Sequence, residues 1–180
     1  GLYFMNDESG VGGLSFNKVY GSLAYQLKIK ENYIGIGIQP GYVFGSFNTW
    51  YNWDHETGTF TAPSNEPGFG ESSNYFDLNA GISWKGNFNN VLAEAGVSML
   101  HLNQPNISFF EGDARQDIVA IINAGADIGL GEKISLRPDL LVRIGSGSEI
   151  TALGTEFSYK ITGRSQVKNL FAAVYIRNGI

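Results

Sequence analysis

Apolar and polar residues alternate along most of this chain, and the stretch from Tyr75 to Pro105 shows the pattern most clearly. Successive side chains of a β-strand point to opposite faces, so a period of two predicts a sheet with one apolar and one polar face. The stretch predicts two strands joined by the turn 86–90, where Gly and Asn tolerate turn backbones. The predicted apolar face of this hairpin consists of Phe76, Leu78, Ala80, Ile82, Trp84, Val91, Ala93, Ala95, Val97 and Met99.

The same alternation predicts about nine strands of roughly 10–14 residues, and no segment has helical periodicity. Strands of globular proteins average about five or six residues, whereas strands that cross a membrane in a barrel need about nine to eleven. Pro40 removes a hydrogen-bond donor inside one strand, so we expect a bulge or an unpaired position there. The predicted strands cover residues 1–6, 14–27, 33–44, 75–85, 91–99, 117–130, 134–144, 150–161 and 167–177.

Short and long connections tend to alternate between these strands. Short turns on one rim and long loops on the other are typical of outer-membrane barrels. The two longest segments, 45–74 and 103–115, are the predicted outer loops. The predicted short turns are 28–32, 85–90, 131–133 and 162–166, a further long connection is 7–13, and 145–149 is an exception to the alternation.

Composition narrows the class of protein. The 180 residues contain no linker, so we expect residues 1–180 to be part of one β-barrel domain. Acidic residues number 17 against 12 basic ones, and a net charge of −5 argues against a nucleic-acid partner. The chain has no cysteine, which excludes disulfides and thiolate metal sites. Gly1 falls in mid-strand and Ile180 in a turn, so we expect both ends to be cut from a longer protein.

Charges of both signs share the predicted polar face, which a charge-paired barrel interior explains. A soluble β-sandwich would present the same residues to water. Strand length, the alternating turns and aromatic residues at strand ends favour the membrane. Arg137, Asp139 and Arg143 either line a pore or fill the interior with ion pairs. The charged residues of this face are Asp77, Glu94, Asp127, Arg137, Asp139, Arg143, Glu156 and Lys160, and the strand-end aromatics are Tyr42, Phe44, Tyr75, Phe76 and Trp84.

An ordered series of segments carries a family resemblance: LYFMNDESGVGGLS, YGSLAYQLKI, YIGIGIQPGYVFGSF, NYFDLNAGISW, AGVSMLHLNQPNISFF and INAGADIGLGEKISLRPDLLVR. The series resembles the PorP/SprF family, outer-membrane proteins of the type IX secretion and gliding systems of Bacteroidetes. YFDLNAGISW and HLNQPNISF are its most specific pieces. The resemblance implies a barrel larger than nine strands. It also implies a role in exporting or anchoring surface adhesins that bear a type IX C-terminal signal, together with other secretion-system subunits and outer-membrane lipid. It brings no catalytic motif.

Aromatic residues in the two outer loops are the candidate partner-binding residues, because Trp, Tyr and Phe bury much area at low entropic cost. The alternative is that these loops fold over the barrel mouth and pack their own aromatic rings, and both readings stay open. The candidates are Trp50, Tyr51, Trp53, Phe60, Phe109 and Phe110.

No catalytic, cofactor or metal site is predicted. The adjacent residues Asp54, His55 and Glu56 cannot all face one ion without a special turn. A hydrolase would need a Ser or an acid placed with a His, and Ser98 and His101, three positions apart, fall on opposite faces of a strand. The rival functions are an outer-membrane channel for passive or selective diffusion and, less favoured, a lipid-modifying enzyme.

Overall fold

The computed structural model describes residues 1–9, 14–47, 51–63, 71–110, 112–161 and 169–179. These residues form twelve β-strands, and within these ranges no helix is long and apolar enough to cross a membrane. The strands are β1 (Leu2–Ser9), β2 (Leu14–Gly21), β3 (Leu23–Ile29), β4 (Asn32–Phe47), β5 (Tyr51–Asp54), β6 (Thr59–Pro63), β7 (Ser72–Phe88), β8 (Val91–Leu100), β9 (Val119–Gly129), β10 (Ile134–Gly145), β11 (Ser148–Lys160) and β12 (Asn169–Gly179).

Ten of the described strands belong to one sheet, and β5 and β6 form a separate hairpin. The sheet order is β1-β2-β4-β7-β8-β9-β10-β11-β12, with β3 paired to β4. Pairing is antiparallel between β1 and β2, between β2 and β4, and between each two neighbouring strands from β7 to β12. The prediction of an all-β antiparallel architecture with long strands is therefore confirmed.

One predicted strand, 14–27, is divided in the structure. Ser22 separates β2 from β3, and the register of β2 with β4 ends at the pair Tyr20 and Gly41, next to Pro40. Pro40 has no N–H to donate, so a regular ladder cannot continue through it. The Gln39 amide donates instead to the Ser22 hydroxyl at 2.8 Å, and this side-chain bond bridges the interruption.

The segment 45–74, which the sequence predicts as one irregular loop, contains regular structure. β4 continues to Phe47 and β7 begins at Ser72. Between them β5 and β6 pair through Trp53 with Phe60 and Asp54 with Thr59. Gly58 has a positive φ of 65°, which suits the turn between these two strands.

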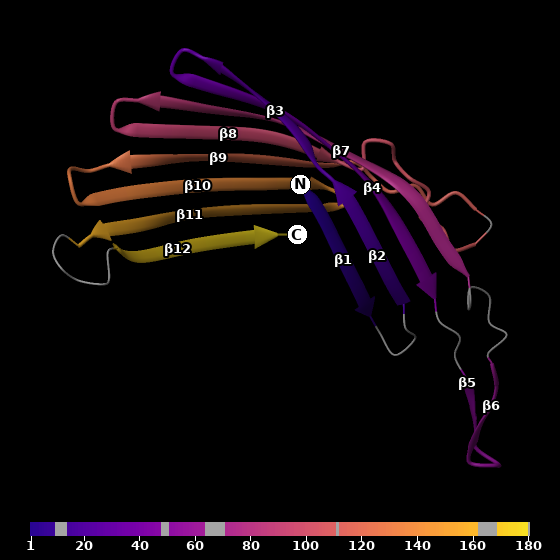
Figure 1. Cartoon of the computed structure of the whole chain (residues 1–180). Helices are drawn as coiled ribbons and strands as arrows, with labels where there is room; N and C mark the ends of the chain where they lie inside the picture. Colours follow the sequence, from indigo (N-terminus) through magenta and orange to yellow (C-terminus); the bar gives the residue numbers. More distant parts are fainter. Residues whose placement is uncertain (10–13, 48–50, 64–70, 111, 162–168, 180) are drawn as a thin grey trace. The chain divides into compact units, whose positions relative to one another are not determined.

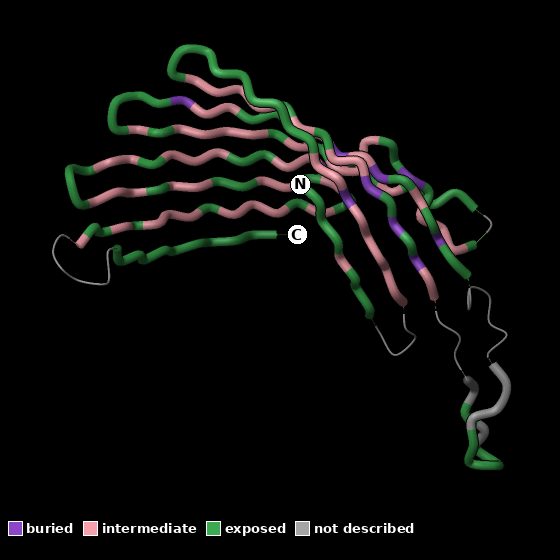
Figure 2. Tube along the Cα trace, in the orientation of Figure 1, coloured by how far each residue is buried: buried purple, intermediate pink, exposed green. Residues whose placement is uncertain are grey.

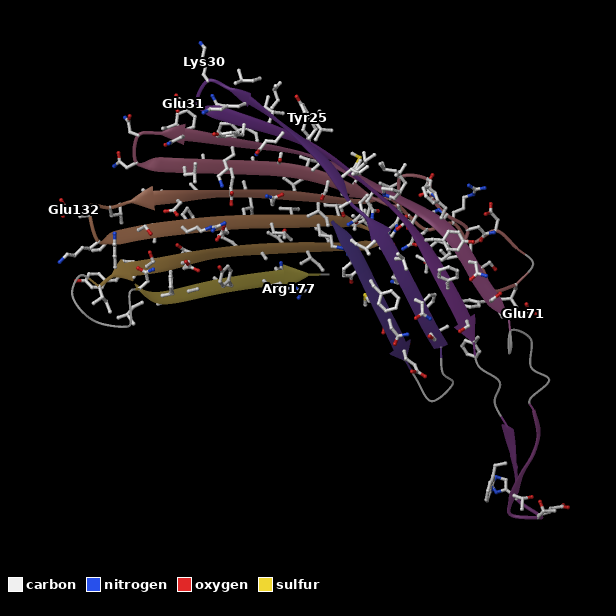
Figure 3. All side chains as sticks on the ribbon, viewed as in Figure 1. Tyr25, Lys30, Glu31, Glu71, Glu132 and Arg177 are labelled. Carbon is white, nitrogen blue, oxygen red and sulfur yellow. The ribbon has the colours of Figure 1, made fainter. Side chains whose placement is uncertain are left out.

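The described chain divides into two compact units. Unit 1 comprises Gly1–Leu23, Gln39–Leu78 and His101–Gln116, and unit 2 comprises Ala24–Ile38, Asn79–Leu100 and Asp117–Ile180. In unit 2, β8 to β12 lie side by side in chain order (Figure 1). Figure 3 shows Lys30 and Glu31 at the β3–β4 turn of this unit and Glu132 at its β9–β10 turn.

Apolar side chains in both units are exposed rather than buried. Ile82 is 53% exposed, whereas Asp77 on the opposite face of β7 is 0% exposed. Only Tyr20, Val43 and Val119 are buried hydrophobic residues among the described positions. Figure 2 shows buried positions along β4 and β7, whereas β12 is exposed along its whole length. The exposed apolar residues include Leu2, Phe4, Tyr42, Phe44 and Phe76 in unit 1 and Ile36, Ile38, Val97, Met99, Ile122, Leu153, Phe157, Leu170 and Val174 in unit 2.

This distribution is the reverse of that in a soluble sandwich, whose apolar faces pack on each other. It is consistent with a β-barrel membrane protein, in which the apolar side of each strand faces lipid and the polar side faces the interior. The phase of alternation predicted from the sequence matches this exposure, as Ile36, Ile82 and Val97 show.

Substitutions on the two faces of β9 test the lipid assignment. Ile122→Arg places a charge on the exposed apolar face near the middle of the strand, and we expect it to lower the free energy of unfolding by about 2–4 kcal/mol. Asn123→Arg, one residue along on the polar face, should change it by about 1 kcal/mol or less. Chemical denaturation of the full chain refolded into lipid vesicles measures both values. Equal losses for the two variants would contradict a lipid-facing Ile122.

Candidate functional site

A buried polar network on the polar face of unit 1 is the candidate site. The Asp77 carboxylate is fully buried and accepts a hydrogen bond from the Tyr20 hydroxyl at 2.8 Å. The His101 ring faces the same carboxylate, with Nδ1 2.9 Å from Oδ1 and 3.0 Å from Oδ2. The other ring nitrogen, Nε2, lies 3.0 Å from Nε2 of Gln116. We call these four residues the Asp77 network.

The strand order explains how Tyr20 reaches Asp77. Tyr20 lies on β2 and Asp77 on β7, and β4 runs between these two strands. Tyr20 is paired with Gly41 of β4, and a Cβ at Gly41 would collide with the Tyr20 ring. The absence of a side chain at this one position lets the phenol ring lie across β4 and present its hydroxyl to the next strand.

The end of β8 places His101. β8 stops at Leu100, and His101 has a positive φ of 58° that turns the chain. Leu102 N then donates to Leu78 O at 2.8 Å. The Asn103 side chain continues this pairing, since its amide donates to Phe76 O at 2.7 Å and its oxygen accepts from Leu78 N at 2.9 Å. The Asn103 side chain therefore takes the place of a neighbouring strand's backbone beside Phe76 and Leu78 of β7.

The residues that follow form a compact loop, which we call the inner loop (residues 101–110 and 112–116). Its two arms are joined by backbone hydrogen bonds from Gln116 N to Pro105 O at 3.0 Å and from Ile107 N to Ala114 O at 2.9 Å. The Asn106 side chain organises the centre of the loop. Its oxygen accepts from Ser108 N and Ala114 N, and its amide donates to Gly112 O. The predicted loop 103–115 is thus internally bonded.

An aromatic contact joins the inner loop to the same face of unit 1. The Phe109 ring lies 6.1 Å from the Phe16 ring and 6.4 Å from the Phe47 ring, in edge-to-face arrangements. Gly45, the partner of Phe16 on β4, makes room for these rings. A Cβ at Gly45 would lie 3.1 Å from Phe109 Cζ and 2.9 Å from both Phe16 Cε1 and Ser73 O. Two groups of contacts therefore hold the inner loop on the polar face.

The hydrogen-bond roles within the network are set by chemistry. An ionised Asp77 can only accept, so Nδ1 of His101 donates to it. The Gln116 amide nitrogen, which can only donate, faces the other ring nitrogen, Nε2. Because both ring nitrogens are engaged, this arrangement orients the loop rather than providing a free base. The buried oxygen Oε1 of Gln116 has no hydrogen-bond partner among the described residues.

A second polar group lies on unit 2. Arg137 Nη2 contacts Glu94 Oε1 at 2.8 Å, and Arg137 Nε contacts Asp139 Oδ1 at 3.4 Å. Lys85 Nζ lies 3.6 Å from the other Glu94 oxygen. Arg143 of the same strand donates to the Ser148 hydroxyl at 3.2 Å. Charges of both signs thus pair across β7, β8 and β10, and Arg137 and Asp139 form ion pairs as one of the two alternatives expected, whereas Arg143 contacts a hydroxyl.

The candidate partner-binding residues fall into three groups. Trp50 lies outside the described residues. Tyr51 and Phe60 lie in β5 and β6, but their side chains are outside the described part. Trp53 is exposed on β5. Phe109 packs on unit 1, whereas its neighbour Phe110 is 58% exposed. The structure therefore separates an anchoring ring from an exposed one in the same loop.

The sequence did not predict the Asp77 network. The alternation placed Asp77 among the charged residues of the polar face. His101 was considered only as a possible catalytic partner of Ser98. The signal that could have found the pair is the combination of an acid near the start of one strand of the hairpin and a His directly after its partner strand. Tyr20 carries no such signal, because its contact with Asp77 crosses an intervening strand.

Long antiparallel strands, an exposed apolar face and a paired polar face together define a membrane β-sheet protein. The family model described as type IX secretion system membrane protein PorP/SprF matches residues 1–176, and the chain belongs to this family. No curated protein and no solved structure matches the chain. The family identification confirms the resemblance drawn from the ordered sequence segments.

Removing the central carboxylate tests the network. Asp77→Ala leaves the Tyr20 hydroxyl and His101 Nδ1 without their shared acceptor, and we expect a loss of about 1–3 kcal/mol in the free energy of unfolding. Asp113→Ala is the control, because the Asp113 carboxylate is exposed and forms a surface ion pair with Arg115 in the inner loop, and it should cost less than about 0.5 kcal/mol. Denaturant titration of the full chain in micelles measures both. A loss for Asp77→Ala no larger than the control would contradict the role of the network.

Proposed function

We propose that this protein is a non-enzymatic outer-membrane β-barrel of the type IX secretion and gliding system that helps to export or anchor secreted surface proteins. Adhesins that bear a type IX C-terminal signal are the expected cargo. The observation that carries the proposal is the family match over residues 1–176, which assigns nearly the whole chain to a membrane component of this secretion system.

The lengths of the strands and their outward residues support a membrane-spanning barrel. β4 has 16 residues and β7 has 17, more than the roughly nine to eleven that cross a bilayer with tilt. On the exposed face of β4, Tyr42 and Phe44 are followed by Ser46. An aromatic pair followed by a polar residue is the order expected where a strand leaves the hydrocarbon.

The pairing of charges supports an anchor over an open channel. Arg137 contacts both Glu94 and Asp139. Lys85 occupies the other oxygen of Glu94. Charges that satisfy one another fill space on a polar face, whereas a selective pore presents rings of one sign. The alternative function, passive or selective diffusion, predicts a large and salt-dependent conductance from the unmodified protein.

Partner binding is assigned to the exposed aromatic residues of the loops, Trp53 and Phe110. Aromatic side chains of this kind commonly supply most of the binding energy of an interface. The family of the protein agrees with contacts to cargo or to neighbouring subunits of the secretion system. So does the position of these two residues outside the ten-stranded sheet. Purification of the full chain in mild detergent, followed by identification of the bound proteins, tests the proposal. Recovery of no secreted or secretion-system protein would contradict it.

Single substitutions separate partner contacts from lipid contacts. Phe110→Ala and Trp53→Ala should each weaken capture of the bound surface protein by about tenfold or more. Leu153→Ala is the matched control, because Leu153 is 57% exposed on β11 and faces lipid in the proposed barrel. Quantified capture from cells producing each variant at equal levels is the measurement. A similar loss with Leu153→Ala would mean that the effect arises from destabilisation.

A further inference from the structure

The Asp77 carboxylate is a buried charge with few sources of compensation. Its exposed fraction is 0%, and Tyr20 donates to it as a neutral hydroxyl. Removing an ionised carboxylate from water is costly unless an opposite charge and hydrogen bonds replace the water. Among the described residues, His101 is the one basic side chain within ion-pair distance of Asp77. Any positive charge beside Asp77 therefore comes from the His101 ring.

The other basic side chains of unit 1 lie in other places. Nζ of Lys18 is 5.7 Å from the centre of the Phe16 ring. Arg115 pairs with Asp113 at 3.2 Å. His55 is exposed in the turn between β5 and β6. None of these three forms an ion pair with the buried carboxylate in the described part of the chain.

The remaining titratable groups around the pair are tyrosines. Tyr20 of β2 bonds to Asp77, and Tyr75 lies two positions before Asp77 on the same face of β7. The Tyr3 ring of β1 lies 6.2 Å from the Tyr20 ring. An ordinary tyrosine is neutral below about pH 10, so these hydroxyls supply hydrogen bonds but no positive charge.

Gln116 is a second, independent indication of charge on the His101 ring. Its Nε2 lies 3.0 Å from Nε2 of His101, whereas its buried Oε1 has no hydrogen-bond partner among the described residues. The two ends of an amide have nearly the same shape, so a half turn of the amide exchanges them. Oε1 then faces Nε2 of His101 and accepts a hydrogen bond if that nitrogen carries a proton. Since Nδ1 already donates to Asp77, a proton on Nε2 makes the ring an imidazolium.

We propose that His101 is a proton-binding residue held as an imidazolium, which donates from Nδ1 to Asp77 and from Nε2 to Oε1 of Gln116. One proton then supplies both the charge that the buried carboxylate lacks and the donor that the buried amide oxygen lacks. Loss of this proton leaves Asp77 with neutral donors and turns the Gln116 amide back. His101 and Gln116 are the first and last residues of the inner loop, so the attachment of its ends to β7 weakens as the pH rises. The inference depends on contacts within unit 1 and not on the proposed secretion role.

The two histidines of the chain allow a direct test, because the exposed His55 serves as an internal reference for His101. Nuclear magnetic resonance of the full chain in micelles, with isotope-labelled histidine, reports the protons on each ring nitrogen from about pH 5 to about pH 9. His101 should keep both ring protons at pH values where His55 has lost one, because a carboxylate in contact favours the charged form. Loss of the proton from His101 at the same pH as from His55, or at a lower pH, would overturn the proposal.

Three variants assign the effect to its sources. Asp77→Asn removes the charge but keeps an oxygen acceptor, and His101 should then lose its second proton no later than His55. Gln116→Met removes the amide oxygen at nearly the same length and should move the proton loss of His101 towards that of His55. Asp113→Asn is the matched control, because it removes an exposed carboxylate of the same loop and should leave His101 unchanged. An equal response to Asp113→Asn and Asp77→Asn would contradict a specific pair.

Stability gives a second readout. In the unfolded chain no carboxylate is held beside His101, so the ring loses its proton at a lower pH than in the folded protein. The stabilisation is therefore complete at the acid end of the range and is lost as the pH rises. The unfolding equilibrium constant of the unmodified protein should increase by about tenfold or more, and that of His101→Gln should not follow this change. Identical pH profiles for the two proteins would contradict the proposal.

The outcome does not depend on the folding of one variant. Assembly of each variant is checked by its folded band in unheated gel electrophoresis. If Asp77→Asn does not assemble, the comparison of His101 with His55 in the unmodified protein decides, because it needs no substitution. Capture of secreted surface proteins is a separate readout, and its failure would remove the proposed secretion role while leaving the titration of His101 as it is.

Discussion

The cross-strand register keeps the apolar side chains of neighbouring strands on one face, and the other features of the structure depend on this separation. Val97, Ile122 and Val142 show it, since they are direct neighbours across β8, β9 and β10. A slip of one residue in any pair would move a whole strand's apolar set to the polar side. In lipid, every backbone polar group must also be paired within the sheet. Long antiparallel strands satisfy both demands.

The polar face is then the place where charge has to be balanced, and the two units do this differently. In unit 2, Glu94, Arg137 and Asp139 form partly exposed ion pairs, which individually contribute about 1 kcal/mol or less. In unit 1, Asp77 is removed from solvent and has to be compensated by specific donors. A buried unsatisfied group costs about 1–3 kcal/mol, so the second arrangement tolerates less variation. Because of this difference, the buried Asp77 carboxylate specifically requires the hydrogen bonds of Tyr20 and His101.

The sequence predicts what is local and misses what is not. Alternation identified the strands and their exposed sides, as at Ile36 and Ile82, because the period of two follows from strand geometry. Pro40 correctly indicated an irregular position, because proline lacks an N–H. The β5–β6 hairpin was missed because four- and five-residue strands give too short a pattern.

The candidate site could not be predicted from the sequence, for a related reason. Phe109 and Phe110 are adjacent and chemically identical, so composition marked both as partner-binding residues. The pairing of Phe16 with Gly45 leaves room for the Phe109 ring, and only this pairing shows that Phe109 packs within the protein itself. Likewise, the contact between Tyr20 and Asp77 depends on a strand lying between them that carries no side chain at that point.

The sequence separation of the Asp77 network has a consequence for assembly. β10 and β11 are joined by a tight turn, and hairpins of this kind form in about 1–10 μs. Tyr20 and Asp77 are 57 positions apart, and Asp77 and His101 are 24 apart, so their contacts carry a much larger loop-closure entropy. The network can form only after β2 and β7 have both docked on β4. The Tyr20–Asp77 hydrogen bond therefore forms later than the local hairpins, whereas the Asp77–His101 contact requires only the pairing of β7 with β8.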